Sequence, residues 1–388
     1  SQGDTMLRRF LPLIILMTLP IQADYQSRVI AEGLDFPWSM TFVSETTLLV
    51  ATRSGTIEQI HLDSNKRSSL SGGPSTYVES QGGYFDLITH PDFERNQLLY
   101  LALAEGPPEA NATAIYQAVL DGDVLTNVTR IFRVNPSKDT AAHYGGKLAF
   151  LPDGTLLLTS GDGFEYREAA QDPFNQLGKV LRMNTDGSPA IDNPFIDGTK
   201  GDPYVYSYGH RSPQGLAIDG NGAIWMHEHG PQGGDELNLV RAGANYGWPA
   251  TSFGINYSGA RVTPLTSAEG IASPVTYWVP SIAPSHLMIY QSALFSDWQG
   301  HLFVSTLVDK DVKRLVIEDQ SVVSETSVFS EFDARVRAIY EGPDGALYLL
   351  TDSDKGQVIE VRPINDAPNP PASGLPVAPG EAASDPIG

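Results

Sequence analysis

The chain has 388 residues, of which 41% are hydrophobic and 18% charged, and it carries 37 glycines and 28 prolines. This length provides for a large core, and the composition suits a turn-rich β protein better than a helical one. The formal net charge of −21 argues against binding to nucleic acid or to an anionic membrane, because both would be repelled, and the lack of cysteine excludes disulfides, thiolate metal sites and cysteine nucleophiles.

The first 23 residues are predicted to be absent from the mature protein. Residues 6–9 form a short basic segment, residues 10–20 are apolar, and Ile21-Gln22-Ala23 resembles a cleavage site. This pattern is typical of a secretory signal peptide, with residues 1–5 as a cloning remnant, and it predicts a periplasmic or secreted protein. An uncleaved membrane anchor is the alternative, but the apolar run is shorter than the roughly 20 residues that a spanning helix needs, and no later segment could span a bilayer.

Three short apolar segments recur in the same order six times between residues 37 and 362. The first segments are residues 37–43, 83–90, 145–151, 213–219, 285–291 and 335–341. The second are residues 46–52, 97–103, 155–161, 223–229, 301–307 and 346–352. The third are residues 55–62, 113–120, 178–185, 235–240, 311–317 and 356–362.

The repeats predict strands joined by tight hairpins. Turn sequences such as LPDGT, IDGNGA and GPDGA precede second segments, and their Asp-Gly or Asn-Gly pairs supply the positive φ that a tight hairpin requires. Strand propensity is high and sustained helical periodicity is absent. The sequence therefore predicts an all-β, six-bladed β-propeller over residues 24–364.

The residues that open the first segments are the informative ones, because the first strand of each blade lines the central channel. These positions are polar or aromatic in nearly every repeat: Trp38, Gln81, His143, Arg211, Ser285, Arg335 and Arg337. Each could simply satisfy the end of a strand. Unlike polar groups that converge on one axis are nevertheless typical of a small-molecule site.

The final segment, residues 365–388, differs in composition from the repeats. It is rich in proline, alanine, glycine and serine and holds few large apolar side chains. Such a segment gains too little from burial to offset its ordering entropy, which predicts a disordered tail.

Four long motifs carry a resemblance to a known family: HYGGKLAFLPDG, SYGHRSPQGLAID, HGPQGGDELNLVRAGANYGWP and RVRAIYEGPDGALYLLTD. Over residues 33–363 the chain resembles the soluble glucose/sorbosone dehydrogenases that depend on pyrroloquinoline quinone (PQQ), most closely the bacterial aldose sugar dehydrogenases. The resemblance implies PQQ and calcium as cofactors. It also implies an aldose sugar that is oxidised at C1 to the lactone, and an external electron acceptor.

The resemblance assigns catalytic roles to two residues. It makes His143 the general base that takes the hydroxyl proton while hydride leaves C1 of the sugar for C5 of the quinone, and imidazole suits this task because it titrates near neutral pH. Arg211 resembles the arginine that stabilises charge at the C5 oxygen. Ser212 stands where related enzymes often carry asparagine and is predicted to support cofactor binding, whereas His210 is interpreted as structural.

Calcium is expected at two places. Gly230 and Pro231 resemble the pair whose main-chain carbonyls hold the catalytic calcium, although a plain Gly-Pro turn is the alternative. Glu236 and Tyr246 match positions that bind a second, structural calcium through a carboxylate and a carbonyl. Calcium favours such oxygen ligands and can act as a Lewis acid. The pair His227 and His229 could suggest zinc, but the sequence offers no third ligand, which favours a structural role.

The other predicted contacts are with PQQ, which carries three carboxylates. Arg335 and Arg337 are two residues apart, so strand alternation would place both guanidinium groups on one face to pair with those carboxylates. Gln81 in SQGGYFD and Tyr257 in GINYSG match family positions that contact the cofactor.

The chain departs from the family at Val308, where a lysine commonly binds PQQ. Lys310 lies two residues further on, and it either replaces the absent lysine or leaves one charge contact missing. The polar sequence VDKD predicts a turn at this point, which favours a solvent-exposed Lys310.

Two other functions remain open from the sequence. A calcium-dependent lactonase-type propeller would need a carboxylate-rich centre on the axis, where this chain offers histidine and three arginines. A non-catalytic ligand-binding propeller would not need His143, Arg211 or the Arg-x-Arg pair, although Val308 mildly favours it. The sequence identifies neither the preferred sugar nor the electron acceptor, and it is compatible with a monomer or a homodimer.

Overall fold

The computed structural model describes residues 25–364, and nearly all of its regular structure is β-strand. The predicted signal peptide and the predicted C-terminal tail lie outside the described residues. The helices within residues 25–364 are short: α1 (Phe93–Asn96) and the 3-10 turns η1 (Pro108–Ala110), η2 (Arg167–Gln171), η3 (Ser296–Trp298) and η4 (Ser330–Phe332). No helix in this part of the chain has the length and apolar character needed to cross a membrane.

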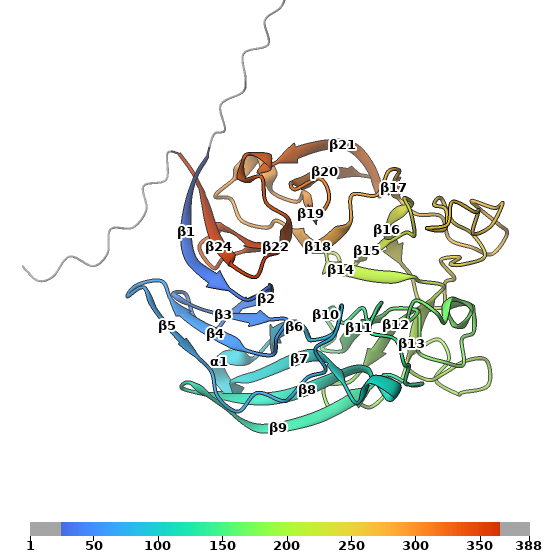
Figure 1. Cartoon of the computed structure of the whole chain (residues 1–388), viewed down its shortest axis with the longest axis horizontal. Helices are drawn as coiled ribbons and strands as arrows, with labels where there is room; N and C mark the ends of the chain where they lie inside the picture. The colour runs from blue at the N-terminus through green and yellow to red at the C-terminus, as the bar shows by residue number, and fades with distance from the viewer. Residues whose placement is uncertain (1–24, 365–388) are drawn as a thin grey trace, which may run out of the picture.

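The strands form six four-stranded antiparallel sheets that surround a central axis as the blades of a propeller (Figure 1). From the axis outward, the first three blades contain β2 (Pro37–Phe42), β3 (Thr47–Thr52), β4 (Ile57–His61) and β5 (Lys66–Ser69); β6 (Tyr84–Thr89), β7 (Leu98–Glu105), β8 (Ala112–Asp121) and β9 (Val124–Arg133); β10 (Leu148–Phe150), β11 (Leu156–Ser160), β12 (Lys179–Met183) and β13 (Val205–Tyr208). The last three contain β14 (Ser212–Ile218), β15 (Ile224–His229), β16 (Asp235–Val240) and β17 (Thr276–Trp278); β18 (Pro284–Ile289), β19 (Leu302–Thr306), β20 (Val312–Glu318) and β21 (Ser321–Val328); β22 (Val336–Glu341), β23 (Leu347–Thr351), β24 (Gly356–Pro363) and β1 (Tyr25–Leu34).

The predicted six-bladed propeller is confirmed, and the three recurring segments are the inner three strands of each blade. The outermost strands were not predicted from the sequence. The reason is visible in β5, whose four residues, KRSS, are all exposed and therefore lack the apolar pattern of a buried strand.

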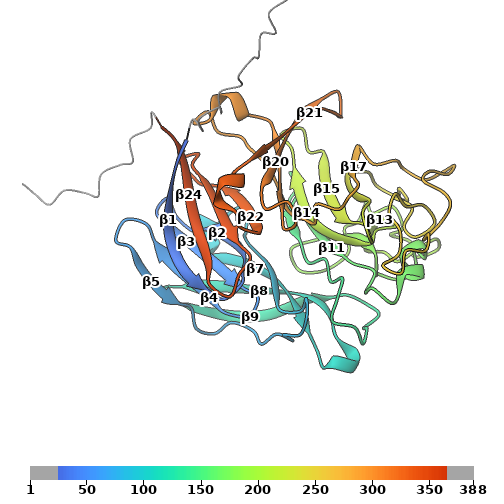
Figure 2. The ribbon, with the colours of Figure 1, turned by 45° about the horizontal axis from the view of Figure 1, so that its top comes forward.

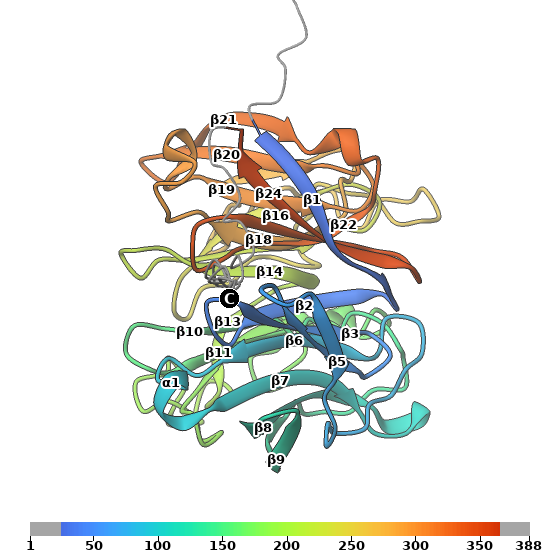
Figure 3. The ribbon, with the colours of Figure 1, turned by 90° about the vertical axis from the view of Figure 1, so that its left-hand side faces the viewer.

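The sixth blade is completed by the N-terminal segment. Strand β1 pairs antiparallel with β24, so that Tyr25 lies opposite Pro363 and Leu34 opposite Gly356. Figures 2 and 3 show β1, in blue, running beside β24, in red. The two ends of the described chain thus close the ring of blades.

Apolar side chains fill the interfaces between blades. One cluster joins the second and third blades through buried residues such as Phe85, Tyr100, Leu156 and Leu181. Because each blade buries its faces against its neighbours, the ring holds the inner strands in fixed positions around the axis. The residues that open those strands are therefore presented from a rigid frame.

Candidate functional site

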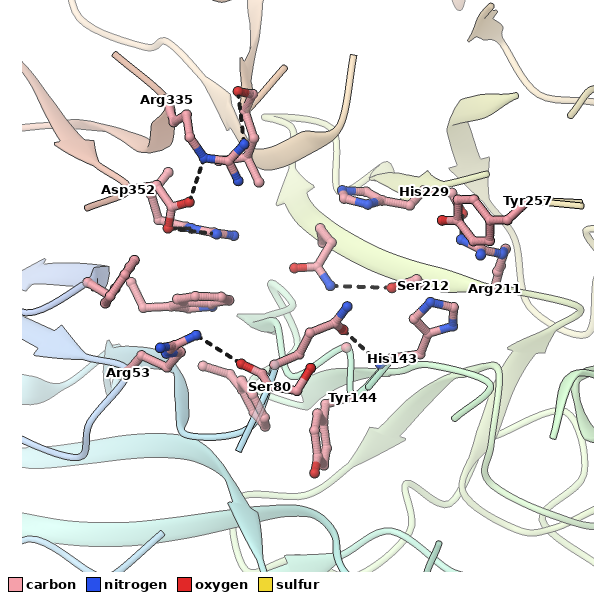
Figure 4. Close-up of a pocket in the computed structure, with 18 residues that line it drawn as sticks. Arg53, Ser80, His143, Tyr144, Arg211, Ser212, His229, Tyr257, Arg335 and Asp352 are labelled. Carbon is pink, nitrogen blue, oxygen red and sulfur yellow. Dashed lines mark hydrogen bonds and ion pairs between the residues drawn. The ribbon is translucent and has the colours of Figure 1, made fainter. Parts of the chain in front are cut away.

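A cavity of about 540 Å³ opens at the end of the axis where the inner strands begin. This volume lies within the range typical of small-ligand sites. Seven of the predicted site residues line it: Gln81, His143, Arg211, Ser212, Tyr257, Arg335 and Arg337. In Figure 4, Arg335 and Asp352 lie across the cavity from His143 and Arg211.

The main chain holds His143 in an unusual conformation at the cavity wall. Its φ is 50°, in the left-handed region that residues other than glycine seldom adopt. The side-chain oxygen of Gln81 accepts a hydrogen bond of 2.8 Å from the main-chain N–H of His143. Behind it, a Cβ on Gly161 would lie 2.1 Å from the His143 carbonyl oxygen, so only glycine leaves room for this close approach. The surroundings therefore determine where the imidazole points.

The imidazole of His143 is oriented by a buried carboxylate. Its Nδ1 lies 2.6 Å from Oδ1 of Asp162, which also accepts a 2.8 Å hydrogen bond from the N–H of Phe164. This contact favours the tautomer with the proton on Nδ1, which leaves Nε2 as the acceptor. Burial lowers the pKa of His143 below its ordinary value, although Asp162 opposes the shift. The imidazole is thus a neutral base at neutral pH.

Asp162 belongs to a wider network that sequence reasoning missed. Trp248 donates from Nε1 to Oδ2 of Asp162 at 2.7 Å, and the guanidinium carbon of Arg211 lies 5.3 Å from the centre of the Trp248 ring. Asp162 lies in the sequence GDG directly after β11, and Trp248 lies in NYGWP. The NYGWP motif therefore connects the histidine wall of the cavity with Arg211.

Arg211 is buried and makes contacts that differ in part from those predicted. Its NH1 donates to the carbonyl oxygens of His229, at 3.2 Å, and Gly230, at 2.6 Å. The Gly230 carbonyl predicted to hold calcium thus accepts from a guanidinium, and Gly230 does not line this cavity. Pro231 is buried and does not line the cavity.

Arg335 and Arg337 converge on one carboxylate that the sequence reasoning did not single out. Nε of Arg335 lies 3.0 Å from Oδ2 of Asp352, and NH2 of Arg337 lies 2.9 Å from Oδ1. Burial raises the pKa of Asp352, but Arg337 and Arg335 outweigh this effect and hold it below its ordinary value. The guanidinium of Arg337 also stacks over Trp38, 3.6 Å from the ring centre. The result is a fixed cationic wall, to which Arg53 adds a further guanidinium.

The predicted reason for the pairing of these two arginines was wrong. Strand β22 begins only at Val336, and its register with β23 is interrupted between Val336 and Ala338. Regular strand alternation therefore does not align Arg335 with Arg337. The irregular register and the shared carboxylate of Asp352 bring both side chains to the cavity.

Lys310 is not brought to the cavity. It lies in a turn with φ of 56°, and its Nζ forms an exposed ion pair with Oδ1 of Asp333 at 2.9 Å. The assignment of Lys310 to the cofactor contacts is therefore corrected, and its exposure agrees with the turn expected for VDKD. Val308 is exposed beside Leu307, which does line the cavity.

A second, much smaller cavity of about 10 Å³ lies behind Arg211, and Glu236 and Tyr246 line it together with Gly230. Glu228, opposite Glu236 in the β15–β16 pairing, lines it as well. Burial and the carboxylate of Glu228 raise the pKa of Glu236 to about 8. Within residues 25–364 no three histidine or acidic side chains are grouped to hold a metal, so a cation here would depend on main-chain oxygens as well.

Three other histidines lie near the cavity, and of these His229 lines it whereas His210 and His227 do not. Nε2 of His229 lies 2.5 Å from the carbonyl oxygen of Pro284. His210 contacts Ser207 and Glu228 and stacks on Tyr246. His227 is fully buried, and burial lowers its pKa to about 3. Among the described residues, no third histidine or acidic side chain is placed with His227 and His229 to complete a zinc site.

Comparisons with known proteins agree with this arrangement. The sequence model of the family described as Glucose / Sorbosone dehydrogenase matches residues 34–360. The aldose sugar dehydrogenase YliI of Escherichia coli is 35% identical over 364 residues, which cover 91% of this chain and 98% of that protein.

Solved structures show the same likeness. A crystal structure of a glucose dehydrogenase has a TM-score of 0.84 and 37% identity, covering 86% of this chain and 99% of that one. The PQQ-bound form of an aldose sugar dehydrogenase from Streptomyces coelicolor has a TM-score of 0.72 and 25% identity, covering 87% and 98%.

Proposed function

The chain belongs to the glucose/sorbosone dehydrogenase family, and we propose that it oxidises aldose sugars at C1 to the lactone with PQQ and calcium, an external acceptor taking the electrons. The observation that carries the proposal is the buried pair of His143 and Asp162, which faces a cavity with arginines on its opposite wall. A base next to a site for a polyanionic cofactor is what this oxidation requires.

The cavity fits PQQ in charge and in size. Arg53, Arg211, Arg335 and Arg337 line it, and guanidinium groups pair well with carboxylates. The Streptomyces relative was solved with PQQ bound. When bound, PQQ would supply the two-electron acceptor, while Gln81, Ser212 and Tyr257 would add polar contacts around it.

The residues of this chain would divide the work of the reaction. Nε2 of His143 would take the proton of the C1 hydroxyl, because Asp162 keeps the other nitrogen protonated and stabilises the imidazolium that forms. Arg211, which is buried in the cavity wall, would stabilise the negative charge that develops on the cofactor as it is reduced. The fixed positions of these groups mean that little reorganisation is needed during the reaction.

Calcium fits the two expected places unequally. In the small cavity, a divalent cation would offset the repulsion between the carboxylates of Glu228 and the partly buried Glu236, and Tyr246 borders the same space. At Gly230, a cation would have to displace the guanidinium of Arg211 from the carbonyl oxygen. The lactonase alternative has less support, because Asp352 is the acidic residue lining the main cavity and it is engaged by two arginines.

The proposal is tested by titrating the protein without cofactors with PQQ and calcium and recording absorbance and activity with several aldoses. We expect sugar-dependent bleaching of the quinone absorbance only when PQQ is present. PQQ binding without reduction by any aldose would favour a non-catalytic ligand-binding propeller instead.

A prediction concerns the cationic wall. We expect Asp352→Asn to lower the free energy of unfolding of the PQQ-free protein by about 3 kcal/mol, because it leaves the buried guanidinium of Arg337 without its counter-ion. We also expect PQQ to stabilise the variant more than the wild type, since its carboxylates would take the place of Asp352. Denaturant unfolding with and without PQQ measures both effects, and a smaller stabilisation of the variant by PQQ would contradict the prediction.

Another prediction concerns the departure at Val308. We expect Lys310→Ala to leave PQQ affinity nearly unchanged, because an exposed ion pair contributes about 0–1 kcal/mol and does not reach the cavity. We expect Val308→Lys to increase affinity by at least about tenfold, the value of a charge-assisted hydrogen bond. Both are compared with the wild type at one salt concentration, and a large loss in Lys310→Ala would show that this lysine does reach the cofactor.

A further inference from the structure

Beneath the cavity, each of the six blades contributes a polar side chain on or next to its innermost strand, except that the fourth blade contributes His227 from its second strand, β15. We call this set the axial polar layer: Ser39, Asp86, Lys147, His227, His286 and Tyr340, from the first blade to the sixth. Three of them, Ser39, Asp86 and Lys147, lie in the sequence between a residue that lines the cavity and a residue that lines the opposite face of the propeller. Trp38, Phe85 and Gly145 line the cavity, whereas Met40, Ile88 and Leu148 line a depression on the opposite face.

Contacts within the axial polar layer tie neighbouring blades together. Nζ of Lys147 lies 3.8 Å from Oδ1 of Asp86, and the rings of His286 and Tyr340 are 4.4 Å apart. The ring of His227 lies over Gly215 of the inner strand β14, where a Cβ would come within 2.2 Å of Nε2. The glycine of the PQGL sequence therefore makes room for this imidazole.

The axial polar layer has more polar atoms than protein partners for them. Ser39 Oγ and Lys147 Nζ are buried without a hydrogen-bond partner among the described residues. Both ring nitrogens of His227, Nδ1 of His286 and the Tyr340 hydroxyl have no well-formed hydrogen bond there either, although main-chain groups of His286, Ile339 and Met40 lie close enough to influence the pKa of these side chains. Leaving a buried donor or acceptor without a partner is costly, and native proteins satisfy such groups with ordered water. Six atoms without a well-formed hydrogen bond in one layer therefore point to bound water.

The charges in the layer favour water over an ion. Lys147 and Asp86 have opposite charges and lie side by side. Burial lowers the pKa of His227 to about 3 and that of His286 well below its ordinary value, so both imidazoles are neutral. The layer thus has many hydrogen-bonding groups and no net charge to hold an ion.

We propose that the axial polar layer binds a chain of buried water molecules that joins the floor of the cavity to the depression on the opposite face and carries protons between them. The role in proton transfer rests on the proposed function. Oxidation of a C1 hydroxyl to the lactone yields two electrons and two protons. The electrons leave to the external acceptor, and the two protons leave through the water chain to solvent at the depression that Tyr340 borders.

The first test is a crystal structure of the cofactor-free protein at a resolution that shows ordered water. We expect water within hydrogen-bond distance of Lys147 Nζ and of at least two further members of the layer. A dry axis would overturn the proposal, and so would a halide in its place, which bromide soaking and anomalous scattering would identify.

The second test measures proton release separately from electron transfer. Sugar-reduced, PQQ-loaded enzyme is mixed with a one-electron acceptor in weak buffer that contains a pH indicator. We expect Tyr340→Phe and Lys147→Met to slow proton release several-fold relative to the wild type while the acceptor is reduced at an unchanged rate. Tyr348→Phe is the matched control, because its buried hydroxyl bonds to Glu360 in the same blade instead of to the layer.

The outcomes separate the two proposals. Equal proton release in the wild type and in both layer variants would overturn the proton path, as would the same slowing in Tyr348→Phe. If the wild type shows no sugar-dependent reduction at all, the proposed function fails, and the crystal structure alone then decides whether the layer binds water.

Discussion

Replacing His143 with alanine should lower turnover at saturating sugar by at least about 10²-fold, the scale of losing a general base. PQQ affinity should remain close to that of the wild type, because Arg335 and Asp352 lie across the cavity from His143 and the ion pairs of Asp352 with Arg335 and Arg337 stay intact. Steady-state kinetics with excess PQQ, together with a PQQ binding titration, measure the two effects. Equal turnover in the variant and the wild type would exclude His143 as the base.

The left-handed conformation of His143 calls for a matched variant. Alanine in this region is strained, so part of a loss in His143→Ala could come from the main chain. Asparagine tolerates the conformation and cannot act as the base. We therefore expect His143→Asn to lose turnover to the same degree, and a nearly active His143→Asn enzyme would point to the main chain instead of the imidazole.

Removal of calcium should abolish activity, and calcium should restore it better than zinc. The expected ligands are oxygens, from the carbonyl groups at Gly230 and Pro231 and the carboxylate of Glu236, and such a set favours calcium over zinc, which prefers nitrogen and sulfur. The measurement is activity of chelator-treated, PQQ-loaded enzyme after addition of each metal. Full activity in thoroughly metal-depleted enzyme would contradict a role for calcium.

A variant can separate the two expected calcium ions. Binding to the native state raises stability, so calcium should raise the melting temperature of the wild type. In Glu236→Gln the small cavity loses the carboxylate that lies opposite Glu228, and this stabilisation should be reduced. Gly230 also borders this small cavity, so retained calcium-dependent activity in Glu236→Gln would place the catalytic ion apart from Glu236, whereas its loss would show that one ion there serves both roles.

The propeller could be predicted because its inner strands carry a strong local signal. Leu48, Leu49 and Val50 of β3 are fully buried, as expected for a strand covered on both faces, and Asp-Gly or Asn-Gly turns mark where several such strands begin. The outermost strands carry no such signal. Most residues of β1 are at least partly exposed, so its pairing with β24 depends on a partner more than 300 residues away.

The sequence predicted the site residues that precede the inner strands, but it did not predict the two carboxylates that support them. His143 and Arg211 lie in long motifs, so their sequence context marks them. Asp162 and Asp352 each follow the second strand of a blade, in GDG and TDS, where an aspartate is equally typical of a turn. Only the folding of each blade brings Asp162 to His143 and Asp352 to the two arginines. The same dependence on tertiary structure explains why Lys310, close to the family position in sequence, lies away from the cavity.

The closure of the ring by β1 and β24 also determines how the protein should respond to a pulling force. The two described ends lie side by side, with Tyr25 opposite Pro363, and the strands run antiparallel from there to Leu34 and Gly356. Tension applied at these ends loads the hydrogen bonds between the strands one after another, as in unzipping, instead of all together, as in shear. The ring should therefore open at its sixth blade at low force, with β1 peeling away before the five blades formed from continuous chain.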